Sequence, residues 1–244
     1  MIRNKYLDLK KYKEFIIRSL KSGRVSYSQT GEDLILDLFL HEKENGFYVD
    51  VGANHPKRLN NTYFFYKKGW RGINIEPNPL IFSRFSSSRP KDINLNIGID
   101  KCLKTSTFFL FKEDALSTFS KEIAEKYEKM GHEIKEERQI SLKPLSLVLR
   151  ENNFDNNLID FFSIDTEGND LSVLESNDWI KFRPKFIILE TLEYKKNGFG
   201  SKLDYDNYFK HLSYKRIIDT YINSIYINLD FLDEFRISSN IISI

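Results

Sequence analysis

The stretch Phe47–Pro56 reads FYVDVGANHP and joins a short apolar run to a turn that contains one glycine. Aromatic and β-branched residues such as those of Phe47–Val49 favour a buried strand. The run ends at Asp50, and the chain turns at Gly52 two residues later. Because the ligands of parallel α/β sheets bind outside the carboxyl ends of the strands, this stretch predicts a ligand site beside Asp50.

The rest of the chain alternates apolar runs of strand length with helical segments. Four such runs follow, at Gly72–Glu76, Ile93–Ile99, Leu158–Asp165 and Lys185–Glu190. Strands separated by helix-length crossovers predict a parallel sheet with helices on both faces. The runs YKRIIDT (214–220) and SIYINL (224–229) are too close for a crossover and predict a hairpin. We therefore predict a doubly wound, mostly parallel, seven-stranded α/β sheet with an antiparallel last strand, the Rossmann-like methyltransferase fold.

The 244 residues are enough for one α/β domain, and neither repeats nor Pro/Gly-rich linkers divide them. We predict an N-terminal helical arm over residues 1–25 and one domain over residues 26–244. Residues 1–24 carry eight Lys or Arg against two acidic residues, which is typical of a solvated helix face or of a segment that docks onto an anionic partner. The charged segment 116–139 interrupts the alternation. It predicts a helical insertion that either covers the site or lies in solvent.

The composition excludes several classes of protein. The net charge is +2, from 37 basic and 35 acidic residues, so the chain as a whole has little excess charge for binding nucleic acid. A single cysteine, Cys102, excludes an intramolecular disulfide and a cysteine-rich zinc site. No stretch near Met1 resembles a signal peptide, and no apolar run approaches the ~20 residues that span a bilayer. We predict a cytoplasmic protein without a membrane or nucleic-acid partner, and its oligomeric state stays open.

The second predicted strand ends at Glu76, 24 residues after Gly52. An acidic side chain at about 20 residues after such a turn binds ribose hydroxyls in dinucleotide-binding folds. A dinucleotide would also need the glycines of G-x-G-x-x-G around its pyrophosphate, and they are missing. S-Adenosylmethionine has a ribose and positive groups but no phosphate. Gly52 lets the backbone approach such a ligand, and the carboxylates of Asp50 and Glu76 suit its positive groups and its ribose. We therefore favour a site for this ligand over the alternative, a tight turn beside a solvated Glu76.

A second acidic cluster, SIDTEGND (163–170), follows the fourth predicted strand. Asp165 is the last residue of that strand and is the candidate for contact with the cofactor and the acceptor. The alternative is an acidic turn that caps the next helix. Carboxylates suit Mg²⁺ or Ca²⁺, but we predict a site without a metal ion.

The candidates for a general base are His55, Asp165 and Glu190. A base needs hydrogen-bond reach to the acceptor hydroxyl, and an imidazole titrates near neutral pH. His55 either acts in this way or orders its loop, and Glu190 either contacts the acceptor or caps a helix. Ser117, at the start of the predicted insertion, is expected near the adenine.

Three segments carry a resemblance to a known family: SYSQTGEDLIL (26–36), FYVDVGANHPKRLNNTYFFYKKGWRGINIEPNP (47–79) and IDFFSIDTEGNDLSVLES (159–176). In their order and spacing they resemble FkbM-type S-adenosylmethionine-dependent methyltransferases, over roughly residues 26–230. The resemblance implies a cofactor site formed by Gln29, Asp50, Gly52, Asn54 and Glu76, with Asp165 facing it.

Members of that family are mostly O-methyltransferases of sugars, glycans and polyketide-type products. The resemblance therefore implies O-methylation of a sugar or nucleotide-activated sugar, as in polysaccharide biosynthesis. Two alternatives stay open, a non-catalytic carbohydrate- or protein-binding module on the same fold and an NAD-dependent sugar-modifying enzyme.

Overall fold

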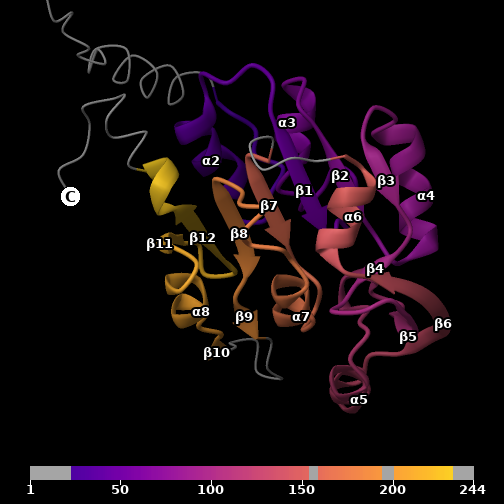
Figure 1. Cartoon of the computed structure of the whole chain (residues 1–244). Helices are drawn as coiled ribbons and strands as arrows, with labels where there is room; N and C mark the ends of the chain where they lie inside the picture. Colours follow the sequence, from indigo (N-terminus) through magenta and orange to yellow (C-terminus); the bar gives the residue numbers. More distant parts are fainter. Residues whose placement is uncertain (1–22, 154–158, 194–200, 233–244) are drawn as a thin grey trace, which may run out of the picture.

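The computed structural model describes residues 23–153, 159–193 and 201–232 (Figure 1). Its centre is a seven-stranded sheet in the order β11-β12-β8-β7-β1-β2-β3. Every pair of neighbours is parallel except those that involve β12, which is antiparallel to β8 and to β11. The predicted fold is confirmed. The strands are β1 (Phe47–Val51), β2 (Arg71–Ile75), β3 (Ile93–Leu95), β7 (Phe161–Ile164), β8 (Phe186–Glu190), β11 (Tyr214–Asp219) and β12 (Asn223–Asn228).

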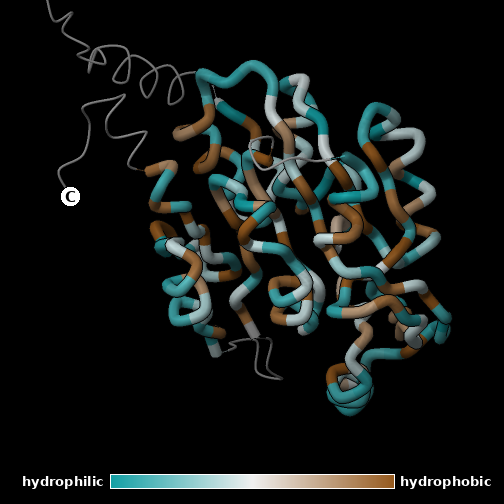
Figure 2. Tube along the Cα trace, viewed as in Figure 1, coloured by the Kyte–Doolittle hydropathy of each residue, from teal (hydrophilic) through white to brown (hydrophobic). Residues whose placement is uncertain are grey.

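Hydrophobic side chains on both faces of this sheet form two cores, and Figure 2 shows the apolar residues along the central strands. Neighbouring residues of β1 point to opposite faces, so that Val49 joins one core and Tyr48 the other. Helices α6 (Leu145–Glu151), α7 (Asp170–Glu175) and α8 (Asp206–Lys210) cover the face of Val49. Helices α2 (Glu32–Leu40) and α3 (Tyr63–Lys67) cover the face of Tyr48, and α4 (Pro79–Ser88) packs on Ala53.

The ends of two helices follow from local sequence. The side chain of Asn78 accepts a hydrogen bond from the backbone N–H of Leu80 at 3.1 Å, and Pro79 occupies the first helical position of α4. Helix α5 (Lys121–Met130) begins after Ser120, whose Oγ accepts from the N–H of Ile123, and ends at Gly131 with a φ of 101°. These caps place the turns after β2 and within the insertion.

The third predicted strand, Ile93–Ile99, is broken into β3 and β4 (Gly98–Ile99), which belong to different sheets. At the break, the side-chain amide of Asn96 donates to the carbonyl oxygens of Glu76 and Pro77 at 2.8 and 3.0 Å. These bonds tie the chain to the end of β2, where it leaves the main sheet.

A small β-lobe, residues 98–143, stands where a helical insertion over 116–139 was predicted. It contains β4, β5 (Lys104–Phe111), a 3₁₀ turn (Asp114–Leu116), α5 and β6 (Ile134–Lys143), with the strand order β4-β6-β5. Within the predicted range only α5 is an α-helix. Residues 134–139 belong to β6, along which exposure alternates residue by residue, as in a strand with one solvated face. Figure 1 shows the lobe on the side to which the central parallel strands point.

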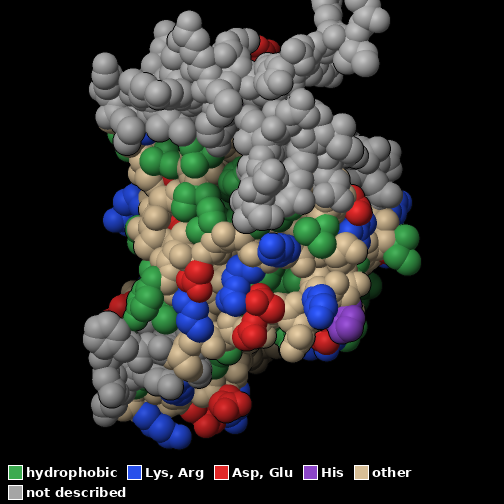
Figure 3. Space-filling model, turned by 90° about the vertical axis from the view of Figure 1, so that its left-hand side faces the viewer, with side chains coloured by type: hydrophobic (Ala, Val, Ile, Leu, Met, Phe, Trp, Pro, Cys, Tyr) green, Lys and Arg blue, Asp and Glu red, His purple; other side chains and the backbone are tan. Residues whose placement is uncertain are grey.

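Residues 1–22 of the predicted arm (residues 1–25) lie outside the described residues. A two-stranded antiparallel sheet of β9 (Leu192–Glu193) and β10 (Ser201–Lys202) follows β8. Basic and acidic side chains are interspersed on the face beside β11 and α8 (Figure 3), where Arg216 and Asp206 form an ion pair at 2.7 Å. None of the described helices is both long enough and apolar enough to cross a membrane.

Candidate active site

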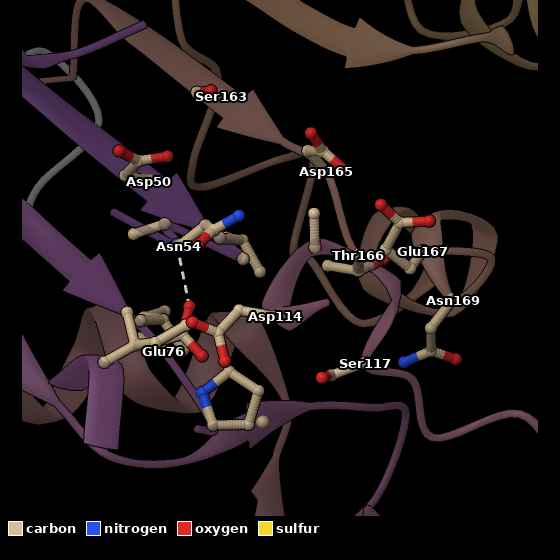
Figure 4. Close-up of a pocket in the computed structure, with 18 of the residues that line it drawn as sticks. Asp50, Asn54, Glu76, Asp114, Ser117, Ser163, Asp165, Thr166, Glu167 and Asn169 are labelled. Atoms are coloured by element: carbon tan, nitrogen blue, oxygen red, sulfur yellow. Dashed lines mark hydrogen bonds between the residues drawn. The ribbon is translucent and has the colours of Figure 1, made fainter. Parts of the chain in front are cut away.

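A pocket with an empty volume of about 950 Å³, partly open to solvent, lies at the carboxyl ends of β1, β2 and β7 (Figure 4). Strand β1 lies between β2 and β7, so that the strand order reverses at this point, which is where doubly wound sheets bind ligands. The lining includes all seven residues predicted to bind the cofactor, which are Gln29, Asp50, Gly52, Asn54, Glu76, Ser117 and Asp165.

Glu76 is held in one orientation by two backbone amides. Its Oε2 accepts a hydrogen bond from the N–H of Asn54, and its Oε1 accepts from the N–H of Asn78, both at 2.7 Å. Burial raises the pKa of the carboxyl to about 7, although the two hydrogen bonds act in the opposite direction. Each oxygen keeps a second acceptor site, so the carboxylate is oriented to accept hydrogen bonds from a vicinal pair of hydroxyls.

Asn54 adopts a left-handed backbone conformation, with a φ of 47°. Asparagine tolerates this region better than most residues, and the conformation belongs to the turn that directs the N–H of Asn54 at Glu76. In Figure 4 the two residues face each other across the left side of the pocket.

Gly52 is required by the packing of two strand ends. Its φ is 76°, and a Cβ atom there would lie 1.7 Å from the carbonyl oxygen of Asp165. Its N–H donates to the carbonyl of Ile75 at 3.0 Å, and the N–H of Asp165 donates to the carbonyl of Val51 at the same distance. The sequence predicted that Gly52 lets the backbone approach a ligand. The structure shows that it admits the end of β7.

The carboxylate of Asp50 is buried and is bound by residues from the loop that follows it. Its Oδ2 accepts from Thr62 Oγ1 at 2.7 Å and from Asn60 Nδ2 at 3.0 Å, and the guanidinium of Arg89 lies 3.9 Å away. Burial raises the pKa of Asp50, and Arg89 opposes that shift. Asp50 therefore stabilises the loop as well as lining the pocket.

Arg89 is fully buried although it follows the surface helix α4. It donates to Asn74 Oδ1 at 3.0 Å and to Thr62 Oγ1 at 2.7 Å, behind the pocket. Asn60, Thr62 and Arg89 were not predicted from the sequence. The one signal for Asn60 and Thr62 is the run of polar residues that follows Asp50.

Asp165, Glu167 and Glu190 form an acidic cluster in which carboxylate oxygens lie within 4.8 Å of one another. Asp165 and Glu167 line the pocket, whereas Glu190, at the end of β8, lies behind them and is 6% exposed. Burial, followed by the charges of neighbouring carboxylates, raises the pKa of all three. A cluster of this kind can share protons or attract a cation.

The β-lobe holds one member of the cluster. Tyr127 of α5 donates its hydroxyl to Glu167 Oε2 at 3.2 Å, and Thr118 Oγ1 donates to the carbonyl of Glu167 at 2.9 Å. A Cβ atom on Gly168 would lie 2.0 Å from Ile123 Cδ1, so the turn and the lobe fit closely. Tyr127 lies in the segment predicted to cover the site, but its contact could not be inferred from the sequence.

The charge of the lining decides which ligands fit. Among the described residues that line the pocket, five are acidic and none is Lys, Arg or His. Such a lining suits the sulfonium and ammonium groups of S-adenosylmethionine and has no group to bind a pyrophosphate. The remaining lining includes Ile75, Ile81, Ile99, Phe108 and Phe119, which offer an apolar surface for an adenine ring.

His55 is not brought together with Asp165 and Glu190. It does not line the pocket, and its Nδ1 accepts from the backbone N–H groups of Lys57 at 3.1 Å and Arg58 at 3.0 Å. Burial, followed by the charges of nearby Arg and Lys residues, lowers its pKa. These bonds order the loop, which is the alternative role considered for His55.

Ser117 lies on the lobe side of the pocket. It is 8% exposed, and its Oγ accepts from the N–H of Phe111 at 3.2 Å. Gln29 reaches the pocket from the segment before α2 and is half-buried.

A sheet with this strand order and an acidic pocket at its switch point defines the class of Rossmann-like S-adenosylmethionine-dependent methyltransferases. The methyltransferase FkbM domain matches residues 50–216. The chain belongs to the FkbM methyltransferase family, and S-adenosylmethionine is its methyl donor. No curated protein sequence matches the chain.

Two solved structures resemble the chain weakly. One is the 1,6-didemethyltoxoflavin-N1-methyltransferase of Burkholderia thailandensis, with bound 1,6-didemethyltoxoflavin and S-adenosylhomocysteine, at 8% identity and a TM-score of 0.39, over 93% of this chain and 89% of that one. The other is a TehB-like SAM-dependent methyltransferase of Corynebacterium glutamicum, at 7% identity and a TM-score of 0.38, over 90% and 97% of the two chains. Likenesses this weak support no conclusion about function.

Proposed function

We propose that the chain is an O-methyltransferase that methylates a hydroxyl of a sugar or nucleotide-activated sugar. The observation that carries this proposal is the acidic cluster at the pocket edge, where carboxylates of raised pKa can accept a hydroxyl proton. Side-chain amides of the lining support a polyhydroxylated acceptor, since they both donate and accept hydrogen bonds. They belong to Gln29, Asn54, Asn61 and Asn169.

The charge of the lining bears on which part of the acceptor enters. A phosphate beside the carboxylates of Asp50, Glu76 and Asp165 would be repelled, and no described lining residue offers a cation to offset that repulsion. The sugar ring of the acceptor therefore faces the cofactor, and any nucleotide part lies away from these carboxylates.

Each residue has a distinct part in the mechanism. When bound, S-adenosylmethionine would supply an electrophilic methyl group to the acceptor oxygen. Glu76 would hold the ribose hydroxyls of the cofactor, and the carboxylates of Asp50 and Asp165 would offer negative charge to its positive groups. Asp165, supported by Glu190, accepts the hydroxyl proton. Positioning of the reactants can contribute up to ~7–11 kcal/mol in favourable cases.

His55 is the remaining predicted base. Its Nδ1 is occupied by two backbone N–H groups, and its ring lies outside the pocket lining, so we assign the proton to the carboxylates. The predicted absence of a metal ion stays a prediction. A divalent ion held by carboxylates is the alternative that a chelator tests.

Two measurements test the proposal. Calorimetric titration of the protein should show binding of S-adenosylhomocysteine and no binding of NAD. Comparable affinity for NAD would favour the NAD-dependent sugar-modifying enzyme, and binding of neither ligand would favour a non-catalytic module.

Methyl transfer from labelled S-adenosylmethionine can then be followed to a panel of neutral glycosides, nucleotide sugars, amino sugars and aromatic amines. We expect label in an ether on a sugar oxygen. Label found only on nitrogen would contradict O-methylation.

A further inference from the structure

The acidic cluster has more carboxylates than the transfer of one methyl group requires. Asp165 lies at the end of β7 and Glu190 at the end of the neighbouring strand β8, where parallel pairing brings them side by side. Glu167, from the turn after β7, completes the set of oxygens within 4.8 Å. Carboxylates this close cannot all be ionised without a compensating charge, so they share protons.

The groups around the cluster make the repulsion stronger. Asp170 faces it from α7, Glu32 from α2, and Asp50 from β1, and all three are buried. The phenol groups of Tyr127, on α5, and Tyr205, before α8, are the other titratable neighbours. Among the described residues, no Lys, Arg or His forms a hydrogen bond or ion pair with Asp165 or Glu190. Buried carboxyls in such surroundings favour the protonated form.

Asp165 and Glu190 differ in access to the pocket. Asp165 is half-buried and lines the pocket, whereas Glu190 is buried behind it. A cation in the pocket therefore acts most directly on Asp165, and Glu190 is placed to exchange a proton with it.

We propose that the Asp165–Glu190 pair holds a proton while the pocket contains no cation, releases it when S-adenosylmethionine binds, and regains one from the acceptor hydroxyl. This inference rests on the proposed function. The pair matches its charge to that of the ligand by losing or keeping a proton, which we call charge matching. It thereby distinguishes the cationic S-adenosylmethionine from S-adenosylhomocysteine, which has no net charge.

The proton balance closes over one turnover. Binding of the cation favours ionised carboxylates, so one proton leaves the pair. During transfer, the O–H bond of the acceptor breaks, the O–CH₃ bond forms, and the C–S bond breaks with its electron pair staying on sulfur. The hydroxyl proton goes to the pair. The cluster and the cofactor together then carry the same charge before and after the reaction, so no net charge is left in the buried site.

The test measures protons as well as affinity. The full-length protein is titrated with S-adenosylmethionine and with S-adenosylhomocysteine at about pH 6.5, where the α-amino groups of both ligands are protonated. Each titration is repeated in phosphate and in Tris, whose ionisation enthalpies differ, so the number of protons released follows from the difference in heat. We expect S-adenosylmethionine to release about one proton more than S-adenosylhomocysteine.

Affinity gives a second readout. The affinity for S-adenosylmethionine should rise by up to about tenfold per pH unit where the pair titrates, and that for S-adenosylhomocysteine should change much less. Glu190→Gln should bind both ligands and lose the additional proton, and Asp165→Asn is the second variant if Glu190→Gln does not fold. The matched control is Glu175→Gln on α7, whose carboxylate pairs with Lys101 outside the pocket. It should release protons as the wild type does.

The test distinguishes a failure of this inference from a failure of the proposed function. Equal proton release by the two ligands, or unchanged release in both cluster variants, would overturn the charge-matching inference and leave the methyltransferase assignment intact. If neither ligand binds, the proposed function and the inference are both overturned.

Discussion

The carbonyl oxygen of Asp165 occupies the space that a Cβ atom on Gly52 would need, at 1.7 Å from the ideal position of that atom. The two residues follow neighbouring strands, β1 and β7, and both line the pocket. Because the obstructing atom belongs to the backbone, a larger residue cannot be accommodated by a rotamer change. The contact therefore sets the distance between the two halves of the site.

We expect Gly52→Ala to destabilise the fold by at least about 3 kcal/mol, since it combines a backbone clash with a φ of 76°. The matched control is Gly69→Ala. Gly69 has a φ of 106° but open space around its Cβ position, so that variant should lose only the strain, roughly 1–2 kcal/mol. Chemical denaturation of both variants checks this, and equal losses would show that Gly52 is required for its conformation alone.

Glu76→Ala should weaken binding of S-adenosylhomocysteine by about 1.5–3 kcal/mol, the range for hydrogen bonds to a charged group. That loss corresponds to roughly tenfold to more than a hundredfold in Kd. Titration calorimetry measures it, with circular dichroism to show that the fold survives.

The matched control for Glu76 is Asp114, an exposed acidic residue that also lines the pocket. Asp114→Asn removes one charge from the lining without removing the two backbone hydrogen bonds of Glu76. It should cost less affinity than Glu76→Ala. A Glu76→Ala protein with unchanged Kd would show that Glu76 only orders the turn.

The cluster predicts a pH-dependent stability in the absence of ligand. The pKa of Asp165 is raised from 3.8 to about 7 in the folded protein, so the folded state binds more protons than the unfolded state between these values. The free energy of unfolding therefore falls as the pH rises through this window, and the cost is complete above about pH 7. Asp165→Asn should stabilise the ligand-free protein by about 1–3 kcal/mol at pH 7.5.

Below about pH 3 the same substitution should have little effect, because the carboxyl is then protonated in both states. Denaturant unfolding at the two pH values makes the comparison within one variant. A stability difference that is the same at both values would contradict the assignment of the titration to Asp165.

Activity variants separate the candidate bases. Once an acceptor is known, Asp165→Asn should lower kcat by about 10²–10⁴-fold, the range for a lost general base. The kcat of His55→Gln should stay within about threefold of the wild-type value, because the His55 ring orders a loop outside the pocket lining. The reverse result would return the role of base to His55.

A chelator tests the prediction that no metal ion takes part. We expect full activity in EDTA, because the cluster adjusts its charge by gaining or losing protons and needs no divalent ion to do so. Loss of activity that added Mg²⁺ restores would instead assign Asp165, Glu167 and Glu190 to a metal ion.

The sequence by itself determined the main sheet and the position of the candidate site. Apolar runs of strand length, separated by helices, specify a parallel sheet through local patterns that a single chain displays. The short connection around Tyr221 forces β12 to be antiparallel. Glu76 was predicted as a site residue because a strand end and its spacing from Gly52 are both visible in the sequence, and it lines the pocket.

Tertiary structure decided which side chains meet. Glu190 lies beside Asp165 only because β8 pairs with β7, and Tyr127 reaches Glu167 only because the β-lobe folds back over the turn. Whether His55 faces the pocket depended on the hydrogen bonds of its own loop. Arg89 is buried behind Asp50 although it stands at the end of α4, where a cation is ordinarily solvated. Local sequence patterns specify elements, whereas contacts between distant elements depend on packing and on the pairing order of strands, which no local pattern contains.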